Sequence, residues 1–269
     1  MTGGQSCRQL KRSPLKKRES LQCTPSALVY SLSRISSPHL FMTLNWRTQM
    51  LPQDTLISKF NLSPELANEL IELGELKTIK SGKTLEAQGL ELDKLIFIFS
   101  GLVSVFRQNF DGAERFVGYI PAGFMYGESA ILHQEKSYAR YHIQETMTAL
   151  FIPASETLRL YNSNPEFSKI IANQVSQKLL YASKILLISH ERDLNRKVGL
   201  ALDSLFRVTQ KYSLPISIEN LAGLLGMSRN TVSKTLNYWQ SEGAITNNKA
   251  NITFNSPEPF STITDGKVF

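Results

Sequence analysis

Donor-rich side chains gather in residues 228–234, where the sequence reads SRNTVSK. Arg229 and Lys234 carry positive charges, and the amide and hydroxyl groups between them offer hydrogen-bond donors and acceptors. These groups suit the base edges and phosphates of DNA. The predicted DNA-contact residues are Ser228, Arg229, Asn230, Thr231, Ser233 and Lys234. The alternative interpretation is a solvated polar helix face.

A second set of residues could form a pocket for a small molecule. It combines aromatic rings with a few polar groups, which suits an aromatic or carboxylated metabolite. The candidate pocket residues are Tyr119, Tyr126, Gly127, Glu128, Tyr138, Tyr181, Ser183 and Lys184. The alternative is that these tyrosines fill the core and rim of a β-barrel.

The elements that must position the DNA-contact residues follow from apolar spacing. Apolar residues recur at helical intervals on both sides of Gly226, at Leu221, Leu224, Leu225, Val232, Leu236 and Trp239. This pattern predicts two short amphipathic helices joined by a tight turn, a helix-turn-helix. Ser228 is a suitable N-cap for the second helix. Residues 244–246 and 251–254 are expected to add a two-stranded wing with a polar turn at 247–249.

Short strands punctuated by glycine are predicted from Leu76 to Pro153. Residues 95–99 and 102–106 are rich in β-branched and aromatic residues, and Asp111-Gly112 signals a hairpin whose return strand is 116–120. The regular spacing of turns favours a small β-sandwich or barrel.

A long helix is expected to follow the barrel. Asn164-Pro165 supplies an N-cap and a first-turn proline, and neither Pro nor Gly recurs before Gly199. The helix carries more apolar surface than one β-domain needs, along Phe167, Ile170, Ile171, Val175, Leu179, Leu180, Ala182, Leu186, Leu187 and Ile188. We therefore expect it to pack on its own domain and on a second subunit. The alternative is a helix buried within a monomer.

The net charge of +7 is concentrated in the N-terminal region, where residues 1–40 hold seven basic residues and one acidic residue. Residues 1–45 are predicted to form a disordered basic tail, and Met42 or Met50 is an alternative start site of translation.

Cys7 and Cys23 give no disulfide framework, so we expect a reduced, cytoplasmic setting. The longest uncharged apolar stretch falls short of the roughly 20 residues that span a membrane, so no membrane association is expected.

Three motifs occur in an order that resembles the Crp/Fnr family (cyclic-AMP receptor protein and fumarate-nitrate regulator) of bacterial transcription factors. They are residues 94–101 (KLIFIFSG), 121–128 (PAGFMYGE) and 226–234 (GMSRNTVSK). The resemblance spans residues 61–254. It implies an α+β fold with an N-terminal double-stranded β-helix (jelly-roll) sensor domain at 50–163, a dimerisation helix at 164–194 and a C-terminal winged helix-turn-helix at 195–258.

The resemblance implies a homodimer that binds double-stranded DNA at a palindromic operator, with the recognition helix in the major groove. Arg229 stands at the position expected to contact a guanine, and Lys234 at a second base or phosphate position. Asn230 replaces the glutamate of the cyclic-AMP receptor group, which favours adenine and predicts a different operator. The Asp111-Gly112 hairpin is where family members often touch RNA polymerase, and a plain solvent turn is the alternative.

The expected effector is an unidentified small organic molecule held between barrel and long helix, with no cofactor or metal. Cyclic-nucleotide binders of this family end the phosphate-binding segment with Arg followed by Ser or Thr. This chain reads Ser137, Tyr138 and Ala139 there, with Arg140 displaced, so cyclic AMP is not expected. The barrel contains no cysteine for an iron-sulfur cluster, and His133 and His142 are expected to be structural rather than haem ligands.

Two other classes of function remain as alternatives. One is a cyclic-nucleotide-binding module of a larger signalling assembly, against which the winged helix argues. The other is a cupin-type metal enzyme built on His133, His142 and Glu128, which lacks the clustered His-x-His spacing of such sites. We therefore expect an effector-responsive DNA-binding regulator and no enzyme activity.

Overall fold

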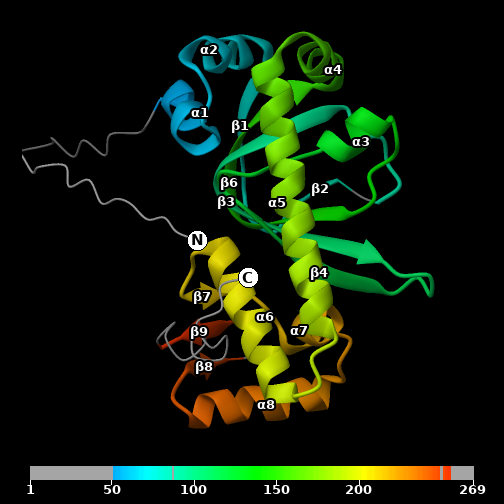
Figure 1. Cartoon of the computed structure of the whole chain (residues 1–269), viewed down its shortest axis with the longest axis vertical. Helices are drawn as coiled ribbons and strands as arrows, with labels where there is room; N and C mark the ends of the chain where they lie inside the picture. Colours follow the sequence, from blue (N-terminus) through cyan, green and yellow to red (C-terminus); the bar gives the residue numbers. More distant parts are fainter. Residues whose placement is uncertain (1–50, 87, 249–250, 256–269) are drawn as a thin grey trace, which may run out of the picture. The chain divides into compact units, whose positions relative to one another are not determined.

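The computed structural model describes residues 51–86, 88–248 and 251–255 (Figure 1). The predicted basic tail, with Cys7 and Cys23, lies outside these residues. The described chain begins with two short helices, α1 (Pro52–Phe60) and α2 (Pro64–Leu73). Both start with proline, and the Ser63 hydroxyl accepts the Leu66 amide to cap α2.

The predicted β-domain is confirmed as an antiparallel sheet in the order β1-β6-β3-β4, with β2 pairing β6 and β5 pairing β3. The strands are β1 (Glu75–Ile79), β2 (Thr84–Glu86), β3 (Lys94–Gln108), β4 (Glu114–Pro121), β5 (Met125–Tyr126) and β6 (Arg140–Pro153). Two helices, which the glycine-punctuated pattern did not predict, are α3 (Glu128–His133) and α4 (Ala154–Ser163). The Asp111-Gly112 turn joins β3 to β4 as expected.

The expectation of separate strands at 95–99 and 102–106 is wrong. Both belong to β3, which passes through Gly101 without a turn. Gly101 has φ of 96°, and a Cβ there would approach Met147 Cα and Thr146 O of β6 to 2.7 Å. Glycine at this point therefore lets one strand bend against its neighbour instead of ending it.

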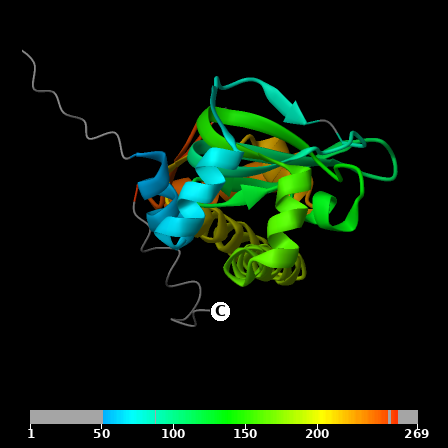
Figure 2. The same ribbon diagram turned by 90° about the horizontal axis from the view of Figure 1, so that it is seen from above.

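Alternation along β3 builds two cores, one on each face of the sheet. Leu95 and Phe97 pack with α1, α2, α4 and the first half of the long helix, whereas Ile96 and Ile98 pack with Tyr126 and Tyr141. Figure 2 shows these helices gathered on one side of the strands.

The long helix α5 runs from Pro165 to Ser189 and is capped by Asn164, whose side chain accepts the Phe167 amide. Its first half buries Phe167 and Ile171 in the core on the helix-covered face of the sheet. The predicted helix to 194 is interrupted at 190–193, because Asp193 caps a new helix, α6 (Leu194–Thr209), through the Arg196 amide.

The C-terminal region forms the predicted winged helix-turn-helix. Its elements after α6 are β7 (Ser213–Leu214), α7 (Ile218–Leu225), α8 (Arg229–Ser241), β8 (Ile245–Asn247) and β9 (Ile252–Phe254). The wing contains a third strand, β7, which sequence patterning missed because it spans only two residues. The indole of Trp239 donates to Asn195 O at 2.9 Å and so fixes α8 against α6. Part of the predicted wing turn, at Lys249, lies outside the described residues.

Candidate functional sites

The turn between α7 and α8 has the geometry of a helix-turn-helix. Gly226 adopts φ of 62° at the C-terminus of α7, and the Met227 amide donates to Ala222 O at 3.0 Å. Ser228 caps α8 by accepting the Thr231 amide at 3.1 Å. The predicted N-cap is therefore confirmed, and the Ser228 hydroxyl also bonds the Thr231 hydroxyl at 2.7 Å.

One face of α8 is buried and the opposite face is open. Val232, Leu236 and Trp239 lie in the core, as their spacing predicts. The predicted DNA-contact residues are exposed at Ser228, Arg229, Asn230 and Lys234 and half-buried at Thr231 and Ser233. Within the described chain neither Arg229 nor Lys234 forms an ion pair. Both cations are therefore available to phosphates and bases.

Sequence reasoning missed Asn237 as a member of this face. It is exposed, and it lies four residues after Ser233 and three after Lys234 on α8. Residues at these intervals are neighbours on a helix surface. The helical spacing is the signal that could have identified it.

Glu128 lies at the junction of the barrel with α5. It is 1% exposed, and its Oε1 lies 2.6 Å from Lys178 Nζ of α5. One turn earlier, Gln174 accepts the Met125 amide and donates to Gly123 O. Side chains of α5 thus hold residues 123–128 of the barrel, and neither Lys178 nor Gln174 was predicted to do so.

Three tyrosines lie within or beside residues 127–139. Tyr126 stacks on Tyr141 with centroids 4.4 Å apart. Tyr138 is partly exposed with the Arg107 guanidinium over its ring, and burial raises the pKa of its hydroxyl. Arg140 is engaged elsewhere, since its Nη2 donates to Glu114 Oε2 at 2.6 Å.

Tyr119 lies between the barrel and the DNA-binding region. It is buried in a core that joins β3 and β4 to α6, α7 and α8. Its hydroxyl donates to Pro215 O, and burial raises its pKa. Beside it, Lys211 Nζ lies 2.7 Å from Glu145 Oε2. Tyr119 thus connects the barrel to the DNA-binding region.

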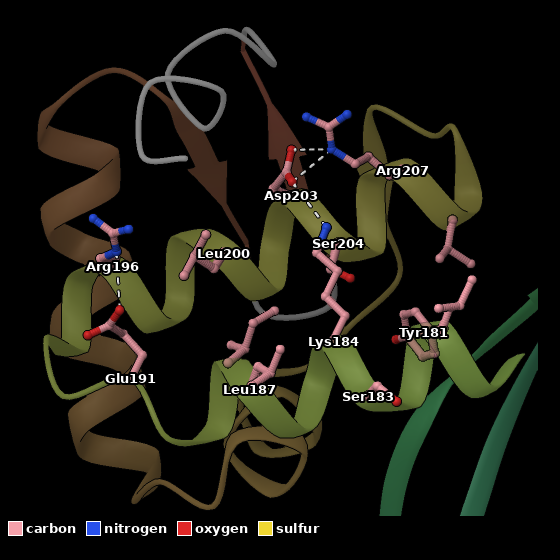
Figure 3. Close-up of a pocket in the computed structure, with 13 residues that line it drawn as sticks. Tyr181, Ser183, Lys184, Leu187, Glu191, Arg196, Leu200, Asp203, Ser204 and Arg207 are labelled. Carbon is pink, nitrogen blue, oxygen red and sulfur yellow. Dashed lines mark hydrogen bonds and ion pairs between the residues drawn. The ribbon is translucent and has the colours of Figure 1, made fainter. Parts of the chain in front are cut away.

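A cavity of about 660 Å³ lies between the second half of α5 and α6 (Figure 3). Of the eight predicted pocket residues, Tyr181, Ser183 and Lys184 line it. The other five lie in the barrel, so the structure does not gather the predicted set into one cavity. The sequence analysis did not identify the α6 residues that line the cavity. Asp203 was the available signal, because it is an acidic residue within the apolar run 198–205.

No group of three His, Cys, Asp or Glu residues within the described ranges is placed to hold a metal. Likewise, no helix among the described residues is both long and apolar enough to cross a membrane.

A β-sandwich, a long helix and an exposed recognition helix in a winged domain together define a DNA-binding transcription regulator with an attached β-domain. Comparison with known proteins agrees. Residues 76–164 match the model of the cyclic nucleotide-binding domain, and residues 186–260 match that of the Crp-like helix-turn-helix domain. The chain belongs to the Crp/Fnr family of transcription regulators.

Two relatives each align with about two thirds of this chain. The chain is 30% identical over 187 residues to the cyclic AMP receptor protein of Thermus thermophilus, covering 68% of this chain and 85% of that protein. The global nitrogen regulator of Nostoc is 21% identical over 194 residues, covering 68% of this chain and 86% of that protein.

Solved structures share the fold. The c-di-GMP responsive global regulator CLP of Xanthomonas campestris superimposes with a TM-score of 0.62 at 17% identity, covering 72% of this chain and 100% of that chain. A CRP/FNR-family regulator of Thermus thermophilus gives 0.59 at 20% identity, covering 71% and 98%.

Proposed function

We propose that this DNA-binding regulator acts as a homodimer on a palindromic operator and that a small organic effector sets its affinity for DNA. The observation that carries the proposal is the apolar surface of α5 that the described residues leave uncovered. Leu179 is 65% exposed, and Val175 and Leu186 lie exposed one or two turns away. A second α5 packed on this surface would bury it and place two copies of α8 on one DNA duplex.

DNA sequence is read, in this proposal, by the exposed side chains of α8. Arg229 has a guanidinium fork that matches the O6 and N7 acceptors of guanine. Asn230 can bond the N6 and N7 of adenine, and Lys234 serves a second base or a phosphate. Each half of the operator would then contain both a guanine and an adenine at neighbouring positions.

The effector in this proposal is organic but is not cyclic AMP. One relative is named a cyclic AMP receptor protein. In this chain Tyr138 stands where the cyclic-nucleotide binders carry an arginine, and Arg140 is held by Glu114. An anionic cyclic phosphate would therefore lack its bidentate partner.

The mechanism is a shift between two arrangements of the DNA-binding domains. An effector that contacts elements on both sides of residues 190–193 would favour the arrangement it binds more tightly. The tip of the β3–β4 hairpin, where Phe110 is fully exposed, is proposed to contact RNA polymerase. We expect the protein to act in the cytoplasm and to have no enzyme activity.

Sedimentation of the full chain tests the dimer. The wild type is expected to have the mass of two 30.3 kDa chains. Leu179→Asp should convert it to monomer and reduce affinity for a palindrome far more than for one half-site. Leu90→Asp, which changes an exposed leucine in the barrel, is the matched control. A monomeric wild type that binds the palindrome and one half-site equally would contradict the proposal.

A further inference from the structure

The groove between α5 and α6, which the Crp/Fnr motifs do not include, has the properties of a ligand site. Its volume of about 660 Å³ lies within the range of about 300–1,000 Å³ that is usual for small-molecule pockets. The residues that line it come from both helices and from the link between them, and those of α5 face those of α6 across it (Figure 3).

The walls of this groove are apolar. Leu180 and Leu187 project from α5, and Leu200 and Val208 from α6. Leu180 and Leu187 are each 69% exposed, so the described residues leave two large apolar side chains uncovered beside a cavity. An apolar body placed over them would remove that surface from water and bind by the hydrophobic effect.

Charges lie at both ends of the groove. Asp203 is 4% exposed, and its two carboxylate oxygens share the single N–H of Arg207 Nε, at 2.8 and 3.0 Å. Lys184 Nζ lies 3.8 Å from the same carboxylate, which is too long for a hydrogen bond. At the other end Arg196 pairs with Glu191 at 3.1 Å. Three cations thus face two acids, and Lys184 is the cation whose pairing is weakest.

Tyr181 connects this groove to the barrel. Its hydroxyl is buried without a hydrogen-bond partner among the described residues. The same hydroxyl lies 3.1 Å from the position that a Cβ of Gly118 would occupy, so the ring packs closely on β4. A ligand that moves Tyr181 would therefore act on the strand that contacts the DNA-binding domain.

We propose that this groove binds an amphipathic organic anion, with its acidic group at Lys184 and its apolar body over Leu180, Leu187 and Leu200. The inference rests on the proposed function, because it gives the effector a site and a chemical class. A bound anion would contact helices on both sides of residues 190–193 and so fix the angle between them. A second copy of α5 fits the groove less well, since an apolar helix would bury these ion pairs without compensation.

Fluorescence titration of the full chain with 1-anilinonaphthalene-8-sulfonate, an amphipathic anion, tests the site, with decanoate as competitor. The wild type is expected to bind one probe per subunit in a saturable manner, and decanoate should displace it. Lys184→Met should weaken binding of both about tenfold, since one charge-assisted contact is lost. Asp203 keeps its bonds to Arg207 in this variant. Lys169→Met, at an exposed lysine of α5 outside the groove, is the control and should bind as the wild type does.

A second pair of variants tests the location of the site. Leu200→Trp should fill the groove and abolish probe binding, whereas Leu194→Trp, at an exposed leucine of the same helix, should leave it unchanged. Absence of saturable binding by the wild type, or equal binding by all four variants, overturns the proposed site. If the wild type is a dimer that binds no probe and Leu200→Trp is a monomer, the groove is a subunit contact and the proposal also fails.

DNA affinity measured in the same preparations separates this inference from the function on which it rests. If the wild type is a dimer that binds a specific DNA sequence but binds neither 1-anilinonaphthalene-8-sulfonate nor decanoate, only the proposed ligand site is wrong. Failure of the wild type to dimerise or to prefer any DNA sequence would instead contradict the proposed function. If the proposed function and the ligand site are both correct, decanoate should change the DNA affinity of the wild type and leave that of Lys184→Met unchanged.

Discussion

The hydroxyl of Tyr119 donates a hydrogen bond to the carbonyl oxygen of Pro215 at 3.0 Å. Tyr119 belongs to β4 of the barrel, and Pro215 precedes α7 of the helix-turn-helix. The Tyr119 ring also packs edge-on against Phe116, with centroids 4.8 Å apart, in the core that both regions share. A conformational change in β4 can therefore be transmitted directly to the helices that present α8.

Tyr119→Phe should weaken this contact while retaining the ring. The variant leaves Pro215 O without its donor in a partly buried position, which should cost about 1 kcal/mol in the free energy of unfolding. Urea denaturation measures the difference. Tyr161→Phe, at an exposed tyrosine, is the control. Equal losses in the two variants would show that the hydrogen bond contributes nothing.

Lys178→Met should destabilise the junction of barrel and long helix. It leaves the carboxylate of Glu128, which is almost fully buried, without its ion-pair partner, a change that typically costs about 3 kcal/mol. The double variant Lys178→Met with Glu128→Gln removes the unpaired charge and should recover much of that loss. Thermal unfolding of the three proteins checks this, and additive losses would contradict the coupling.

The ion pair between Glu114 and Arg140 should make stability depend on pH in acid. The pKa of Glu114 lies below its usual 4.5, mainly because the guanidinium of Arg140 donates a hydrogen bond to its carboxylate. Because this pKa is lower in the folded state, the stabilisation is present above pH 4.5 and is lost as the pH falls through the folded-state value.

The comparison of wild type with Glu114→Gln measures that dependence. The wild type should have the higher Tm at pH 7, and the two values should converge as the pH falls below 4.5. A Tm difference that does not change with pH would mean that the carboxylate charge is not its cause. Glu114 is partly exposed, so the difference should also shrink in high salt.

The local structure of the DNA-binding region could be predicted closely from its residues. Ser228 caps α8 and Gly226 ends α7 because capping chemistry and a left-handed backbone are local requirements. The continuous strand through Gly101 could not be predicted, for the opposite reason. Its conformation is imposed by the backbone of Met147 in a distant strand, and no local pattern reveals that contact.

The sensor side could be predicted only in part. The aromatic residues were identified, but Tyr119, Tyr126 and Lys184 lie in three different places. Which tyrosine meets which helix depends on the packing of β4 and α5, which is a long-range property. The interruption of the long helix at 190–193 was likewise missed, although Asp193 carries the signal of an N-cap.

The central claim is that α8 reads DNA sequence, with Arg229 as its main base contact. Selection of bound sites from random DNA, using the wild type and Arg229→Ala in parallel, tests it most directly. The wild type should enrich an inverted repeat with half-sites about 10 base pairs apart, each holding a guanine and an adenine. Arg229→Ala should lose preference at the guanine alone, at a cost of about 1–3 kcal/mol. Enrichment of the same motif by both proteins, or of none by the wild type, would contradict the account.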